Sequence, residues 1–228
     1  MIDIYAFATP NSIKVPIALE ELELDYVLHP VNVRQGEQKK AEFIALNPNG
    51  KVPVLVDSTV ASDRLVLTES AAILIYLAEK TGKLLPASGA ARARVFEQLF
   101  FHASALGPAF GQAGFFQRQA AEPQPLAMQR FSTEAARTVK VLDGVLARHA
   151  FVAGEEFSIA DIAHFGWFWR REFAGVSLED TPDVARWFDA VASCAAVQCA
   201  IERAGDRLTL SGTAAYNLSP LRQRICGL

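Results

Sequence analysis

Strand and helix signals alternate over the first eighty residues of this 228-residue chain. An apolar strand over 2–7 precedes a helix over 12–22 with apolar residues at helical spacing, and an extended run follows from 26 to 33. A strand, a crossover helix and a second strand form a parallel pair with a right-handed connection. We therefore expect the chain to begin with a βαβ unit.

The helices and strands expected after this unit follow the order of a known type of domain. We expect a short helix near 39–46, strands over 52–56 and 64–67, and a helix over 70–80 that Gly82 ends. The order βαβ, α, ββ, α is that of a thioredoxin-like α/β domain.

The rest of the chain carries helical signals only, and we expect Gly107-Pro108 to break or kink a helix. Ser158 and Asp161 have the spacing of a helix capping box, and Pro182 suits the first turn of another helix. We expect four parts: a thioredoxin-like domain over 1–80, a linker over 81–90, an all-helical domain over 91–205 and a surface tail over 206–228.

Composition excludes several classes of partner. The net charge is −3, and the 22 basic and 25 acidic residues are mixed along the length, so no surface for nucleic acid or an anionic membrane is indicated. No window approaches roughly 18 consecutive apolar residues. The four histidines show no metal-ligand spacing. The expected partner is a small molecule or another protein, without a metal.

The cysteines bear on the compartment. All three, Cys194, Cys199 and Cys226, lie in the last fifth of the chain and form no C-x-x-C pair. The first residues lead straight into a strand rather than a signal peptide. This pattern fits buried or inert thiols in a reducing cytoplasm, without a disulfide scaffold.

Residues 9–12, Thr-Pro-Asn-Ser, lie where a thioredoxin-type fold has its reactive site. A redox protein with its own cysteine pair would place that pair here, but this chain does not. The segment instead provides the hydroxyl of Thr9, the amide of Asn11 and the N–H groups of a helix start, which suit an anion. Any thiol used at this site must therefore come from a ligand.

Several motifs in order resemble those of a soluble glutathione transferase, over about residues 1–200. The carrying segments are Thr9-Pro10-Asn11, Gln38, Asn47 to Pro53, Glu69-Ser70 and Phe157 to Asp161. Within the family, the phrase Ala8 to Asn11, its spacing to Gln38 and the run Leu106-Gly107-Pro108 are most similar to the bacterial Nu class.

The resemblance implies a site for glutathione along the first domain. It implies a cis peptide between Val52 and Pro53, which aims the backbone of Val52 at the cysteinyl unit of the ligand. Glu69 would take the ammonium and Ser70 the carboxylate of the γ-glutamyl end. The further contacts that it implies are Gln38, Lys51, which could meet the glycine carboxylate, and Arg130.

Thr9 and Asn11 are the candidate ligands of the glutathione thiolate. Simpler interpretations stay open: turn and N-cap chemistry for these two residues, a strand-start proline at Pro53, and a plain helix cap at Glu69-Ser70. The alternative for Gln38, Lys51 and Arg130 is that they are ordinary solvated side chains.

The resemblance implies a glutathione-dependent transferase and disulfide-bond reductase, with glutathione as co-substrate. The implied reactions are thiol–disulfide exchange and weak conjugation of electrophiles, with the second substrate entering between the domains near 110–116. A cytoplasmic homodimer is expected. The alternative is a non-enzymatic relative that keeps the fold as a binding or regulatory module.

Overall fold

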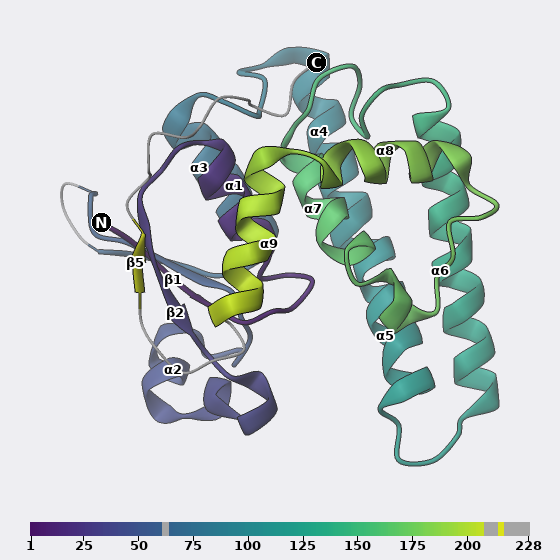
Figure 1. The fold of residues 1–228 in the computed structure, drawn as a ribbon, viewed down its shortest axis with the longest axis horizontal. Coiled ribbons are helices and arrows are strands. Elements are labelled where there is room, and N and C mark those ends of the chain that lie inside the picture. Colours follow the sequence, from purple (N-terminus) through teal and green to yellow (C-terminus); the bar gives the residue numbers. More distant parts are fainter. Residues whose placement is uncertain (61–63, 208–213, 217–228) are drawn as a thin grey trace. The chain divides into compact units, whose positions relative to one another are not determined.

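The structure is a computed structural model that describes residues 1–60, 64–207 and 214–216 (Figure 1). The chain divides into two compact units. The first combines residues 1–83 with the described residues from 193 onward, and the second comprises residues 84–192.

The first unit is built on a mixed sheet of strand order β4-β3-β1-β2-β5. β1 pairs in parallel with β2 and antiparallel with β3, which confirms the predicted βαβ unit followed by a hairpin. The strands are β1 Ile2–Ala6, β2 Tyr26–Pro30, β3 Val54–Asp57, β4 Leu65–Leu67 and β5 Ala214–Tyr216.

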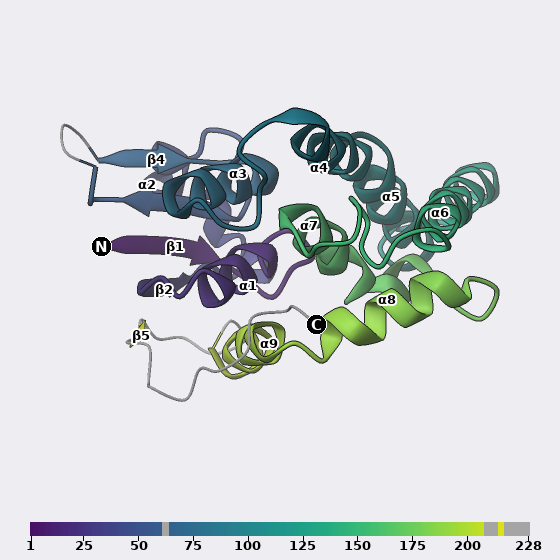
Figure 2. The ribbon, with the colours of Figure 1, turned by 90° about the horizontal axis from the view of Figure 1, so that it is seen from above.

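Helices cover this sheet. The first unit contains α1 Lys14–Glu21, the 3₁₀ turns η1 Val33–Gln35 and η2 Glu37–Lys39, α2 Ala41–Leu46, α3 Ser70–Thr81 and α9 Ala195–Arg207. α1 packs between α3 and α9, and Figure 2 shows α1 and α3 side by side along the sheet. Every residue of α1 is buried. The thioredoxin-like domain is thus confirmed, with α9 as an addition.

The second unit is all-helical, as predicted. Its elements are α4 Gly89–Phe101, the π-helical turn η3 His102–Leu106, α5 Gly107–Arg118, α6 Pro125–Leu146, α7 Ile159–Phe168, the 3₁₀ turn η4 Arg171–Ala174 and α8 Pro182–Ala192. All of α7 is buried, and it packs on α4 and α8. Ser158 and Asp161 form the predicted capping box before α7.

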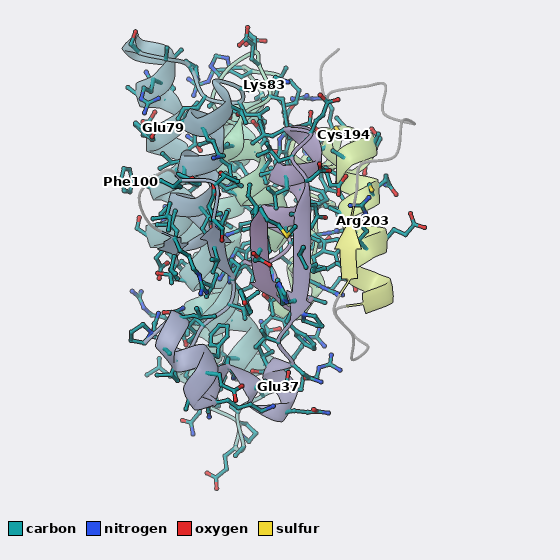
Figure 3. All side chains as sticks on the ribbon, turned by 90° about the vertical axis from the view of Figure 1, so that its left-hand side faces the viewer. Glu37, Glu79, Lys83, Phe100, Cys194 and Arg203 are labelled. Atoms are coloured by element: carbon teal, nitrogen blue, oxygen red, sulfur yellow. The ribbon has the colours of Figure 1, made fainter. Side chains whose placement is uncertain are left out.

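The expected helical domain over 91–205 is wrong at its C-terminal end, because α9 packs on α1 in the first unit. The guanidinium of Arg203, labelled in Figure 3, pairs with the buried carboxylate of Glu20, which also accepts from the Tyr26 hydroxyl at 2.9 Å. A buried carboxylate requires such partners. This ion pair links α9 to α1, and Val197, Ala200 and Ala204 of α9 are buried as well.

Three further expectations need correction. α4 begins at Gly89, inside the expected linker. Gly107-Pro108 does not break the helix, because a π turn in which the Gly107 N–H bonds to the His102 carbonyl continues it and accommodates a proline that lacks an N–H. In the expected tail, residues 206–207 belong to α9 and 214–216 form β5, while 208–213 and 217–228 lie outside the described residues.

The expectation of a chain without disulfides is also wrong. Cys194 is disulfide-bonded, whereas Cys199 is not. Within the described ranges no single helix is long and apolar enough to cross a membrane. Only the bent pair of α8 and residues 195–204 passes such a test together.

Candidate functional site

Thr9 closes the turn that leads into α1. The N–H groups of Ser12 and Ile13 both donate to its carbonyl at 3.1 Å. Its hydroxyl accepts from the Ser12 N–H at 3.3 Å and donates to the Ser12 hydroxyl oxygen at 3.0 Å. Thr9 has one hydroxyl hydrogen, and the geometry directs it to Ser12. The turn role is therefore present, whereas the N-cap of α1 is Ile13, which makes no side-chain capping hydrogen bond. A bond from Thr9 to a thiolate would require this hydroxyl pair to reverse its direction.

Asn11 lies next to this turn, and its side chain is exposed. Its amide oxygen Oδ1 accepts from the Lys14 ammonium at 2.8 Å. An ammonium donates only, so the oxygen must face Lys14 and the NH₂ group must face away from it. In the described part of the chain no group takes the Nδ2 hydrogens. Asn11 thus presents two available donors beside the helix start.

Lys14 is the residue that the sequence analysis missed. Its side chain is 1% exposed, and its Nζ also lies 3.3 Å from the Ser70 hydroxyl oxygen. Burial lowers the pKa of Lys14 to about 7, against the opposing charge of Glu69. The spacing of three residues between Asn11 and Lys14 was the available signal. Nothing in the apolar periodicity of 12–22 reveals that a lysine there is buried.

The loop before β3 is closed by the side chain of Asn47. Its Nδ2 donates to the Lys51 carbonyl at 2.6 Å, and its Oδ1 accepts from the Asn49 N–H at 3.0 Å. The Val52–Pro53 peptide that follows is cis, which confirms this expectation. Across the described residues no hydrogen bond occupies the N–H or C=O of Val52. Both groups are available to a ligand.

Gln38 packs against this same loop. A Cβ atom on Gly50 would lie 3.3 Å from the Gln38 carbonyl oxygen, so η2 and the loop are in close contact. The side-chain oxygen Oε1 of Gln38 is buried and has no hydrogen-bond partner in the described structure. Buried polar atoms are rarely left unpaired. This acceptor suits a ligand N–H, while the Lys51 side chain is exposed nearby.

Glu69 and Ser70 begin α3. Glu69 has φ 65° and ψ 111°, an unfavourable conformation for a residue other than glycine, and its side chain makes no capping hydrogen bond. The structure therefore does not support the interpretation of Glu69 as a plain side-chain cap. Such conformations concentrate at functional sites. The Ser70 hydroxyl oxygen accepts from Lys14, which leaves its hydrogen for another acceptor.

The first unit thus brings most of the predicted site residues into two separate groups. Asn11, Lys14 and Ser70 are joined by hydrogen bonds, and Gln38 adjoins the loop that carries Lys51, Val52 and Pro53. Arg130 is an exposed residue of α6 in the second unit, so its part in the site stays a prediction.

The aromatic stretch 110–116 is only partly suited to meet a substrate. Phe110 is fully buried and packs edge-on against Trp167 and Phe168, which makes it a core residue. Phe116 stacks on Phe131, and Phe115 is exposed. No cluster of three His, Cys, Asp or Glu side chains that could hold a metal occurs in the part of the chain that the structure describes.

Comparison with known proteins gives matches to both units. Residues 8–80 match the family model of the glutathione S-transferase N-terminal domain, and residues 102–194 match that of the C-terminal domain. The disulfide-bond oxidoreductase YfcG of Escherichia coli is 40% identical over 197 residues, which cover 85% of this chain and 91% of that protein.

Solved structures show the same likeness. A glutathione transferase family member from Pseudomonas fluorescens, with two glutathione bound, is 37% identical with a TM-score of 0.83 and covers 88% of this chain and 92% of its own. A glutathione transferase from Pseudomonas putida, with one glutathione disulfide bound per subunit, is 36% identical with a TM-score of 0.81, and the coverage is 88% and 90%.

Proposed function

The chain belongs to the glutathione S-transferase family, and from this premise we propose that it is a glutathione-dependent disulfide-bond reductase. Bound glutathione supplies the reacting thiolate, and Asn11 and Thr9 hold it. The observation that carries the proposal is the Lys14 ammonium, which donates to both Asn11 and Ser70. Asn11 is the candidate that holds the thiolate, and Ser70 is the candidate that holds the γ-glutamyl carboxylate at the other end of the ligand.

The remaining contacts follow from the available groups of the first unit. The unpaired N–H and C=O of Val52, beside the cis bond to Pro53, take the cysteinyl unit of glutathione. Glu69 takes the γ-glutamyl ammonium, since its carboxylate is exposed beside Ser70. Gln38 and Lys51 bind nearer the glycine end. Arg130 is the one proposed contact that the second unit carries.

The ligands of the relatives support the reaction class. Two glutathione molecules and one glutathione disulfide are the reduced and oxidised forms of the same pair, and they are bound in the Pseudomonas fluorescens and Pseudomonas putida proteins, respectively. YfcG is named a disulfide-bond oxidoreductase. Thiol–disulfide exchange therefore fits this family member better than conjugation, which we propose as a weaker activity toward electrophiles.

The reaction takes two exchanges. The thiolate of the first glutathione attacks one sulfur of the substrate disulfide, its S–S bond breaks, and a mixed disulfide and one substrate thiolate result. The thiolate of the second glutathione then attacks the glutathione sulfur of the mixed disulfide, which releases the second substrate thiolate and forms glutathione disulfide. The two substrate thiolates take up the two protons that the glutathiones lost.

Ionisation of glutathione contributes little to the rate by itself. A thiol with a pKa near 8.5 is only about 3% thiolate at pH 7, and a decrease of about two units raises that fraction about 25-fold. The less basic thiolate is about eightfold less nucleophilic at a Brønsted slope near 0.45, which leaves about a threefold gain. Asn11 and Thr9 therefore act mainly by placing the sulfur in line with the disulfide.

The test is reduction of hydroxyethyl disulfide by glutathione, with the Thr9→Ala/Asn11→Ala double variant and Ser58→Ala, an exposed position at the end of β3, as control. Loss of charge-assisted hydrogen bonds should lower kcat/KM of the double variant by roughly ten- to a hundredfold. Full activity in the double variant would reject these thiolate ligands. Retention of the wild-type protein on immobilised glutathione without turnover would instead favour the binding module.

We also propose that the protein works as a homodimer; the cytoplasmic location stays a prediction, because Cys194 is disulfide-bonded and the cysteines no longer favour a reducing compartment. The support is the family membership and the exposed apolar residues of the helical unit, of which Phe100 on α4 is 69% exposed (Figure 3). A C2 pair is the commonest arrangement of such oligomers.

A further inference from the structure

We infer that Lys14 is a positioning residue for this reaction: its buried Nζ orients the donors of Asn11 and Ser70 toward glutathione. The inference rests on the proposed function, since it assigns a role within the same site. It concerns a residue that lies beneath the site and would act through its two neighbours.

The burial of Lys14 has no explanation in packing alone. Lysine is among the residues least often fully buried, and burial of its charged form is unfavourable without partners. α1 is buried along its whole length, so an apolar side chain would satisfy this position better. Two of its recorded partners, Asn11 and Ser70, are residues that the proposed function assigns to glutathione. The position therefore fits a functional requirement.

The bond to Asn11 selects one of two amide orientations. A carboxamide can rotate by half a turn and exchange its oxygen and nitrogen. Nζ at 2.8 Å accepts no hydrogen bond when it is charged, so it admits only the oxygen. The NH₂ group is then held on the exposed side of Asn11, where an anion would need donors. Without Lys14 both orientations would be populated, and one of them presents an oxygen lone pair to the thiolate.

The bond to Ser70 has the same effect on a hydroxyl. Because the Ser70 oxygen accepts from Nζ at 3.3 Å, its own hydrogen is available to the γ-glutamyl carboxylate. One buried group thus directs a donor to each of two anionic groups of the ligand. Burial lowers the pKa of Lys14 to about 7, while the negative charge of Glu69 favours the charged form of Lys14.

The test is a double-mutant cycle of Lys14→Met and Asn11→Ala. Methionine keeps the length and apolar stem of lysine and removes the donor. The readouts are kcat/KM for hydroxyethyl disulfide and the pKa of bound glutathione, followed by the ultraviolet absorbance of its thiolate. Lys83→Met, an exposed lysine labelled in Figure 3, is the matched control.

If Lys14 acts through Asn11 and Ser70, Lys14→Met lowers kcat/KM about tenfold and raises the pKa of bound glutathione. Once Asn11 is alanine, Lys14→Met should raise that pKa much less, and it should lower kcat/KM by less than tenfold, because only the loss through Ser70 remains. Two results would overturn the inference while wild-type turnover upholds the proposed function. One is an unchanged Lys14→Met protein, and the other is a Lys14→Met effect on the pKa of bound glutathione and on kcat/KM that is the same with asparagine and with alanine at position 11. Absence of turnover in the wild-type protein would reject the proposed function, and this inference with it.

A second variant keeps the inference testable where Lys14→Met fails to fold. Asn11→Asp retains an acceptor for the ammonium but removes the donor. It should lose as much kcat/KM as Asn11→Ala and yet have the higher melting temperature of the two, because its carboxylate pairs with Lys14. A melting temperature no higher than that of Asn11→Ala would contradict the placement of the ammonium at this acceptor.

Discussion

Asn11 and Thr9 stand two positions apart in one motif, but they differ in the hydrogens that they can offer a ligand. Both Nδ2 hydrogens of Asn11 lack a partner among the described residues, whereas the one hydroxyl hydrogen of Thr9 is directed to Ser12. The two residues would therefore contribute unequally to holding a thiolate, although the motif alone suggested equal roles.

This difference predicts unequal single variants. Asn11→Ala should lower kcat/KM for hydroxyethyl disulfide roughly three- to tenfold more than Thr9→Ala, because it removes an NH₂ group that is available to the thiolate. Thr9→Ala should instead lower the melting temperature more, since its hydroxyl closes the turn into α1. Steady-state kinetics and thermal denaturation of both variants provide the measurement. A greater kinetic loss in Thr9→Ala would contradict the assignment.

The sequence was informative about candidate residues and less so about their bonds. The motif order pointed to Thr9, Asn11 and the Val52–Pro53 bond, and the cis peptide is confirmed. Lys14 could not be recognised in the same way. Periodicity shows that a helix has a buried face, but a lysine on that face is normally assumed to extend to solvent.

At the scale of elements, the start of α3 has an unfavourable backbone conformation. Glu69 has φ 65° immediately before the first helical residue, Ser70. Glu23, in the turn after α1, has φ 56° and is likewise exposed, but it belongs to no candidate site. The two glutamates are therefore a pair of exposed residues with a positive φ, one with and one without a proposed ligand contact.

Substitution of each glutamate by glycine distinguishes the effect of backbone strain on stability from a contact with glutathione. Both Glu69→Gly and Glu23→Gly relieve a positive φ at the cost of a more flexible unfolded chain, so each should change the free energy of unfolding by no more than about 1 kcal/mol. Only Glu69→Gly should raise KM for glutathione, about tenfold, because it removes the carboxylate proposed to bind the ammonium. Denaturant unfolding measures the change in stability of both variants, and steady-state kinetics measures their KM for glutathione. An unchanged KM in Glu69→Gly would show that Glu69 makes no such contact.

Element order was predictable, whereas several element boundaries were not. Composition and spacing placed β1, α1, β2, β3, β4 and α3 in the right sequence, because each carries its own apolar period. The start of α4 at Gly89 and the continuous helix through Gly107 were missed. Glycine and proline were taken to interrupt structure there, and neighbouring turns accommodate them instead.

On the scale of the whole molecule, the expectation that proved wrong is the position of α9. Arg203 and Glu20 are 183 residues apart in the chain, and no local pattern links them. A helix that follows a helical domain was assigned to that domain, but its buried ion pair belongs to the first unit. Long-range pairs of this kind are available only from a structure.

The central claim for the molecule is that its reactive thiol belongs to glutathione. The three cysteines of the sequence are Cys194, Cys199 and Cys226, and Cys194 is disulfide-bonded in the structure. None lies in the segment 9–12 where a protein thiol would react in this fold. The chemistry should therefore be independent of every cysteine in the chain.

The most direct measurement is glutathione-dependent reduction of hydroxyethyl disulfide by the variant Cys194→Ala/Cys199→Ala/Cys226→Ala, with its folded state checked by thermal denaturation. The account predicts kcat/KM within about twofold of the wild-type value, since the bound glutathione thiolate attacks the disulfide. A folded, cysteine-free protein that binds glutathione but no longer reduces the disulfide would contradict it.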